Sequence, residues 1–180
     1  MDLRLVITDI DGVWTDGSMY YDERGTELKR FNTSDSAGVL FCRLNDIDVA
    51  ILTGEQTDMV ARRAKKLNVR HLYQGIQNKK ATAQRLLDTL GLTFAQTAFI
   101  GDDINDIPLL QAVGYAGTVP SAPDYVKRYA TYVTHRDGGA GAFRDFVEHL
   151  LLQRGLLEQT IDKYLAQIPS TVGTGERVSP

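Results

Sequence analysis

Short apolar runs alternate with helix-like segments along most of the chain, and no other feature of the sequence constrains the fold as strongly. The strand-like runs are Leu3–Ile7, "DVAIL", "VRHLY", "TAFI", "YAGTV" and "TYVT". Helical patterns lie between them, for example from Asn78 to Leu90 and from Ala142 onward. Strands that alternate with helices form parallel sheets covered by helices on both faces. The sequence therefore predicts an α/β fold with a Rossmann-like, three-layer arrangement.

Composition limits the classes of protein to which the chain can belong. Its 180 residues suffice for one sizeable domain, and its net charge of −3 argues against nucleic acid as the main partner. Cys42 is the only cysteine, which excludes an intrachain disulfide and suits a reducing compartment. No signal peptide or membrane-spanning run is apparent. We expect a cytoplasmic protein with no membrane and no nucleic-acid partner.

Two segments stand outside the alternation of strands and helices. Residues 18–31 alternate apolar and polar side chains around Gly25, which predicts a β-hairpin. Residues 153–180 follow the predicted domain of residues 1–152 and combine an amphipathic helix with the polar tail "STVGTGERVSP". Thr33 or Ser34 is expected to cap the helix after the hairpin, and Thr57 the next helix. Trp14 either packs the first loop or lines an entrance.

Polar residues follow three of the apolar runs directly. Asp9 and Asp11 come after the first run, Thr53 and Gly54 after "DVAIL", and Asp102 and Asp103 after "TAFIG". In parallel α/β sheets, ligands bind beyond the carboxyl ends of the strands, where these loops meet. The sequence thus predicts one polar crevice built from three separate loops.

The residue types in this crevice suit phosphoryl transfer. Converging carboxylates form a hard oxygen site of the kind that Mg²⁺ prefers, while Thr53 and Gly54 offer donors to phosphate oxygens. Either Lys79 or Lys80 can complete an anion site. Asp9 can attack phosphorus and Asp11 can act as general acid and base. A calcium EF-hand is excluded, because Tyr20 stands where that loop needs glutamate.

Four motifs appear in the order found in the haloacid dehalogenase superfamily, and the chain resembles that superfamily over most of its length. They are "DIDGVWTDG", "ILTG", the lysine in "QGIQNKK", and "GDDINDIP". The resemblance implies that Asp9 is the nucleophile and Asp11 the acid and base. It implies phosphate binding by Thr53, Gly54 and Lys79, Mg²⁺ binding by Asp9, Asp102 and the backbone carbonyl of Asp11, and orientation of the metal site by Asp103 and Asp106.

Spacing narrows the resemblance to members without a cap domain, since the intervals between the motifs are too short to hold one. Such members that act on 3-deoxy-2-keto sugar-acid phosphates form homotetramers, which implies a homotetramer here. Glu55 stands where enzymes for 3-deoxy-D-manno-octulosonate (KDO) 8-phosphate usually carry arginine. This favours 3-deoxynononate (KDN) 9-phosphate as substrate, with KDO 8-phosphate as the alternative. Glu55, Arg63 and Lys66 are the expected substrate-binding residues, the last two across a subunit interface.

Two non-enzymatic readings are weaker. Phospho-receiver domains share the acids, hydroxyl and lysine, but their acidic pair comes first in the chain, whereas here Asp102 and Asp103 come last. A receiver also has no need of Asp11. An idle assembly module would not require every motif residue to be intact.

Overall fold

A six-stranded parallel sheet forms the centre of the protein, in a computed structural model that describes residues 2–168. The strand order is β5-β4-β1-β6-β7-β8. The strands are β1 (Leu5–Thr8), β4 (Asp48–Leu52), β5 (His71–Tyr73), β6 (Thr97–Ile100), β7 (Tyr115–Thr118) and β8 (Tyr132–Val133). The chain builds the sheet outward from β1 in one direction and then returns to β1's other side. This reversal places the loops after β1, β4 and β6 side by side.

The register of the three central strands aligns their carboxyl ends. Thr8 pairs with Ile51 of β4 and with Ile100 of β6. The Asp9 amide then donates to the Ile100 carbonyl at 3.0 Å, which continues the pairing by one residue. The residues that follow these strands therefore emerge at one edge of the sheet.

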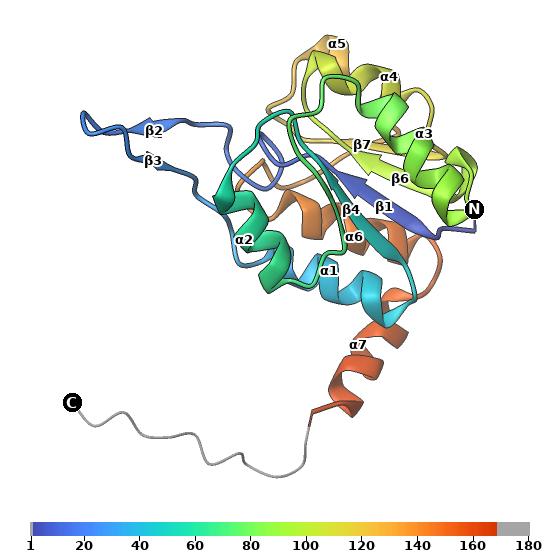
Figure 1. The fold of residues 1–180 in the computed structure, drawn as a ribbon. Coiled ribbons are helices and arrows are strands. Elements are labelled where there is room, and N and C mark those ends of the chain that lie inside the picture. Colours follow the sequence, from blue (N-terminus) through green and yellow to red (C-terminus); the bar gives the residue numbers. More distant parts are fainter. Residues whose placement is uncertain (1, 169–180) are drawn as a thin grey trace, which may run out of the picture.

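Helices cover both faces of the sheet, as the sequence predicted (Figure 1). One face carries α1 (Asp35–Leu44), α2 (Asp58–Lys66) and α6 (Ala142–Leu152), and α1 packs along α6. The other carries α3 (Lys79–Leu90), α4 (Ile107–Leu110) and α5 (Asp124–Lys127). Two short 3₁₀ helices, η1 (Phe94–Gln96) and η2 (Ile104–Asp106), precede β6 and α4. Among the described residues, no helix is both long and apolar enough to cross a membrane.

A two-stranded hairpin projects from the domain between β1 and α1 (Figure 1). It consists of β2 (Tyr20–Tyr21) and β3 (Glu27–Leu28) and lies within the predicted range of residues 18–31. The Asp22 carboxylate accepts the amides of Arg24 and Thr26, which closes the turn. The interval between α3 and β6 holds only η1. Within residues 2–168, no cap domain is present.

Trp14 lies in the core behind the first loop and does not line an entrance. Its side chain is fully buried, its ring lies 4.9 Å from that of Phe143 in α6, and its Nε1 donates to the Thr8 hydroxyl at 2.9 Å. Trp14 thus packs the loop against the core. Cys42 is also buried.

The helix caps were only partly predicted. Thr57 accepts the Val60 amide and caps α2, as expected. Ser34 occupies the N-cap position of α1 but makes no capping hydrogen bond with its side chain, and Asn32 accepts the Ser34 amide instead. The predicted N-cap position at Ser34 is therefore confirmed, but its hydroxyl makes no capping hydrogen bond, and an upstream asparagine orders this turn.

The last described helix, α7 (Leu157–Ala166), packs on the C-terminal end of α1. Thr160 is buried there and accepts a hydrogen bond from the Asn45 side chain at 2.8 Å. The polar tail, with Arg177, lies outside the described residues.

Candidate active site

The loops after β1, β4 and β6 enclose a pocket of about 270 Å³ at the predicted edge of the sheet. This confirms that the three polar strand ends converge. The lining residues are Asp9, Asp11, Gly12, Gly17, Thr53, Gly54, Glu55, Asp102, Asp103 and Asn105.

Lys79 lies at the floor of this site between two buried carboxylates. Its ammonium group is 2.7 Å from Asp9 Oδ2 and 2.6 Å from Asp106 Oδ1, and its side chain is only 1% exposed. Asn78 caps α3 by accepting the Ala81 amide, which fixes the first turn of the helix and points Lys79 inward. Lys80 is exposed. Of the two lysines that the sequence left open, the structure therefore brings Lys79 to the site.

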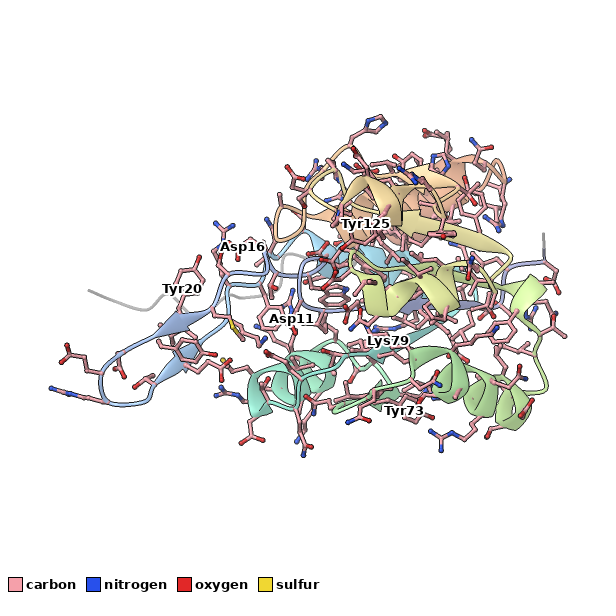
Figure 2. All side chains as sticks on the ribbon, turned by 90° about the horizontal axis from the view of Figure 1, so that it is seen from above. Asp11, Asp16, Tyr20, Tyr73, Lys79 and Tyr125 are labelled. Atoms are coloured by element: carbon pink, nitrogen blue, oxygen red, sulfur yellow. The ribbon has the colours of Figure 1, made fainter. Side chains whose placement is uncertain are left out.

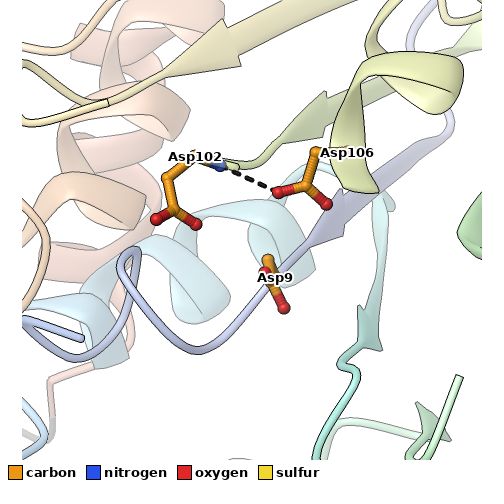
Figure 3. Close-up of side chains that lie close together, drawn as sticks. All are labelled: Asp9, Asp102 and Asp106. Carbon is orange, nitrogen blue, oxygen red and sulfur yellow. Dashed lines mark hydrogen bonds between the residues drawn. The ribbon is translucent and has the colours of Figure 1, made fainter. Parts of the chain in front are cut away.

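Asp106 holds the acidic loop in place. Its Oδ2 accepts the amide of Asp102 at 2.9 Å (Figure 3). Its Oδ2 also accepts the amide of Asp103 at 3.1 Å, and its Oδ1 contacts Lys79. A Cβ on Gly101 would lie 2.5 Å from the Asp106 carboxyl carbon, so glycine is required there. These contacts agree with an orienting role for Asp106. Asp103 lines the pocket, and its carboxylate caps η2.

An acidic group in the site is positioned to bind a metal ion. Carboxylate oxygens of Asp9, Asp102 and Asp106 lie within 4.8 Å of one another (Figure 3). Asp102 Oδ1 is buried and has no hydrogen-bond partner, as expected for an atom that a cation would engage. The donors are all carboxylates, which suits a hard divalent cation such as Mg²⁺. The Asp11 side chain is not part of this group; the resemblance assigns its backbone carbonyl instead.

Two carboxylates of this group, those of Asp9 and Asp102, have raised pKa values. Burial, followed by the charges of Asp9 and Asp106, raises the pKa of Asp102 to about 8. Burial also raises the pKa of Asp9, against the opposing charge of Lys79. A bound dication reverses this balance because it favours the ionised carboxylates.

Gly12 lets the first loop approach Asp102 closely. Its φ is +79°, and a Cβ there would lie 1.9 Å from Asp102 Oδ2. Any larger residue would be strained at this positive φ and would clash with Asp102.

Thr53 and Gly54 occupy the expected positions beside the acids. Thr53 is fully buried, and its hydroxyl lies 3.4 Å from Asp11 Oδ2. Its amide and carbonyl are both bonded within the loops, to Tyr73 and Ile76. Gly54 lines the pocket and is exposed.

Of the three expected substrate-binding residues, one lines the pocket and two do not. Glu55 lines the pocket. Arg63 instead donates to the Asn32 carbonyl at 3.1 Å and the Ser36 hydroxyl at 3.0 Å, and Lys66 is exposed at the end of α2. Neither lines the pocket of its own chain. Their action across a subunit interface stays a prediction.

Lys29 was not identified from the sequence as a residue of the site. It follows β3 in the hairpin, and its ammonium contacts the carboxylates of Asp11 and Glu55. Its side chain is 5% exposed, whereas that of its neighbour Arg30 is 64% exposed. The alternation of the hairpin strand separates these two faces, but only the folded loops show what Lys29 meets.

A parallel α/β sheet with an aspartate pair after its first strand, a hydroxyl after its second, a buried lysine and a late acidic loop defines the haloacid dehalogenase class of hydrolases. A family model for haloacid dehalogenase-like hydrolases matches residues 71–142. Relatives that match most of the chain agree, and the protein belongs to this family.

Curated relatives that are similar to this chain over most of its length share one enzyme activity. The KDO 8-phosphate phosphatase of Salmonella typhi is 39% identical over 158 residues, covering 88% of this chain and 84% of the relative. That of Yersinia pestis is 41% identical over 157 residues, covering 87% and 84%. These relatives are phosphoric monoester hydrolases, and the present chain is an enzyme of that class.

Solved structures of this group have the same fold. The KDO 8-phosphate phosphatase of Moraxella catarrhalis, in complex with magnesium, phosphate and KDO, matches with a TM-score of 0.87 at 32% identity over 91% of this chain and 94% of that chain. The cobalt-bound enzyme of Haemophilus influenzae matches with a TM-score of 0.85 at 36% identity over 91% and 97%.

Proposed function

We propose that this enzyme is an Mg²⁺-dependent phosphatase that hydrolyses KDO 8-phosphate through an aspartyl-phosphate intermediate. The observation that carries the proposal is the pairing of Asp9 and Asp11 in a pocket with Lys79 beneath and Asp102 beside them. The substrate rests on the curated relatives, whose names specify KDO 8-phosphate. The sequence analysis put KDN 9-phosphate first on the strength of Glu55, and the relatives do not support that choice; they favour its alternative.

In the first step, an oxygen of Asp9 bonds to phosphorus while the bond from phosphorus to the sugar oxygen breaks. The Ile10 amide holds Asp9 Oδ1 at 2.7 Å and Lys79 holds Oδ2, so the carboxylate is aligned before the substrate arrives. Asp11 gives its proton to the leaving sugar oxygen.

In the second step, Asp11 takes a proton from water as the water oxygen attacks phosphorus, and the bond to Asp9 breaks. Inorganic phosphate leaves and both aspartates return to their starting states. Thr53 and the Gly54 backbone bind phosphoryl oxygens in both steps. Mg²⁺ held by Asp9, Asp102 and the Asp11 carbonyl supplies positive charge that screens the carboxylates from the phosphate.

The proposal includes a homotetramer whose subunits complete one another's sites. The pocket lacks a cap within the described residues, and apolar side chains are exposed on the hairpin and on α7. Those on the hairpin are Met19, Tyr20, Tyr21 and Leu28. Covering this surface with a neighbouring subunit would also close the pocket, which protects an acyl-phosphate from premature water attack.

The test is phosphate release from KDO 8-phosphate and KDN 9-phosphate with Mg²⁺, after chelation, and in Asp9→Asn. We expect higher kcat/KM for KDO 8-phosphate, loss of activity on chelation and its return with Mg²⁺. Asp9→Asn should lose roughly three orders of magnitude or more in kcat. A clear preference for KDN 9-phosphate would refute the substrate assignment, and substantial turnover by Asp9→Asn would refute the covalent mechanism.

A further inference from the structure

The hairpin places one lysine against two carboxylates that line the active-site pocket. Lys29 follows β3 and is almost fully buried, whereas Leu28 before it is 61% exposed. Successive side chains of a strand point to opposite faces, so the hairpin presents an apolar face outward and Lys29 inward. Figure 2 labels Asp11 between the body of the domain and the hairpin that carries Tyr20.

Lys29 connects three segments that are far apart in the sequence. Its ammonium contacts Asp11 Oδ1 from the loop after β1 and Glu55 Oε2 from the loop after β4. Both partner side chains remain about one-third exposed, at 32% and 35%. Burial works against the charged form of Lys29, but the hydrogen bonds that it donates to Asp11 and Glu55, together with their charges, outweigh this effect, and the pKa of Lys29 is raised. Lys29 therefore stays a cation at neutral pH.

The negative charge of the pocket lining indicates a role for the Lys29 cation. Carboxylates dominate the lining, and no lysine or arginine is among the described residues that line it. Lys79 lies underneath, already bonded to Asp9 and Asp106. An anionic substrate thus meets repulsion in this pocket, and Lys29 brings a further positive charge to two of the lining carboxylates, those of Asp11 and Glu55.

The proposed role of Asp11 as general acid implies that the leaving group lies beside Lys29. Asp11 must reach the ester oxygen to protonate it, so the remainder of the leaving group begins next to Asp11. Lys29 and Glu55 are the charged groups that extend from Asp11 along the hairpin side. An ammonium has three N–H groups, and contacts with Asp11 and Glu55 use two of them.

We infer that Lys29 is a binding residue for the leaving group, where with Glu55 it forms a donor and acceptor pair for a polyhydroxylated sugar acid. The third N–H of Lys29 donates to a hydroxyl or carboxylate oxygen of the sugar, and the second carboxylate oxygen of Glu55 accepts from a neighbouring hydroxyl. This rests on the proposed function, because it assumes that Asp11 protonates the leaving group. By this inference, the hairpin of the same chain contributes to substrate specificity.

The experiment compares Lys29→Met with wild type on two substrates. KDO 8-phosphate carries the hydroxyls and carboxylate, whereas the leaving group of p-nitrophenyl phosphate carries neither. We expect kcat/KM for KDO 8-phosphate to fall roughly 10- to 100-fold more than for p-nitrophenyl phosphate, mainly through KM, as for loss of a charged hydrogen bond. Arg30→Met is the matched control: it removes an exposed cation from the next position in the chain and should change neither substrate's kinetics.

Two further variants separate binding from folding. Lys29→Gln keeps a donor on a shorter, neutral stem and should show an intermediate loss, with the thermal unfolding temperature checked for each variant. In Lys29→Met with Glu55→Gln, the combined loss should be smaller than the product of the single losses, because the two groups act as a pair.

Equal losses on both substrates would overturn the inference, since Lys29 would then act only through Asp11 or the fold. Unchanged kinetics on both would overturn it as well and reduce the contact to a local ion pair. Failure of the proposed function is distinguishable from either result, because it would appear as wild-type enzyme that does not hydrolyse KDO 8-phosphate.

Discussion

Gly138, in the loop after β8, lies directly behind Gly12 in the loop that carries the aspartate pair. A Cβ on Gly138 would stand 1.9 Å from the Gly12 carbonyl oxygen and 2.8 Å from that of Thr15. The next residue, Gly139, donates its amide to the Val13 carbonyl at 3.1 Å. A loop remote in sequence thus supports the nucleophile loop from behind.

Gly138→Ala should therefore displace the first loop, because the new methyl group meets backbone that cannot rotate away. We expect kcat to fall about tenfold or more and the free energy of unfolding to fall by roughly 1–3 kcal/mol. Gly155→Ala is the control, since no atom lies within 4 Å of its Cβ position. It should cost only the strain of a positive φ and leave kcat unchanged. Wild-type kcat in Gly138→Ala would show that the support is not needed.

Removal of the Lys79 charge should destabilise the fold as well as stop turnover. In Lys79→Met, the buried carboxylates of Asp9 and Asp106 lose their shared cation. Breaking a buried ion pair in this way costs roughly 3–5 kcal/mol. Lys80→Met, one residue on and exposed, should change stability by about 0.5 kcal/mol at most. Urea denaturation of both variants without metal checks this, and equal midpoints would contradict it.

Asp35 should make stability depend on pH in an unusual direction. Burial raises its pKa from 3.8 to about 6, despite the Arg144 amide and the charge of Arg63. The folded state therefore binds this proton more tightly than the unfolded state. The contribution of Asp35 to stability is full below the unfolded pKa and is lost as pH rises through the folded value.

The variant Asp35→Asn removes this titration. Its free energy of unfolding relative to wild type should increase between about pH 4 and pH 7, by roughly 1–3 kcal/mol from a shift of about two pKa units. Denaturation measured at several pH values checks the slope. Asp124→Asn, whose side chain is 92% exposed, is the control and should run parallel to wild type. A difference between Asp35→Asn and wild type that is constant with pH would refute the assignment.

Assembly should depend on the exposed face of the hairpin. Tyr21 in β2 is 64% exposed, and Tyr21→Lys would place a charge in a subunit contact made by the hairpin. We expect light scattering to show a tetramer for wild type and a smaller species for Tyr21→Lys. Tyr125→Lys, on α5 and 45% exposed, should remain tetrameric. A fully active wild-type monomer at assay concentrations would contradict the proposed assembly.

Local sequence patterns were sufficient to predict some helix ends but not the packing of the first loop. Thr57 caps α2 as predicted because its hydroxyl needs only the next three residues. Ser34 is the N-cap of α1 as predicted, but its hydroxyl does not cap the helix, and Asn32 accepts the Ser34 amide. Trp14 required knowledge of Phe143, which comes from the opposite end of the chain.

The sequence by itself determined the parallel α/β sheet and the place of Asp9, Thr53 and Asp102, because strand period and chain order fix which residues follow each strand. The resemblance of the motifs to a known family already points to Lys79 rather than Lys80, whereas only the tertiary structure brings Lys29 to Asp11 and Glu55. The physical reason is the range of the interactions involved. A strand end is encoded by its own neighbours, whereas a buried lysine is placed by the carboxylates that distant loops bring to it.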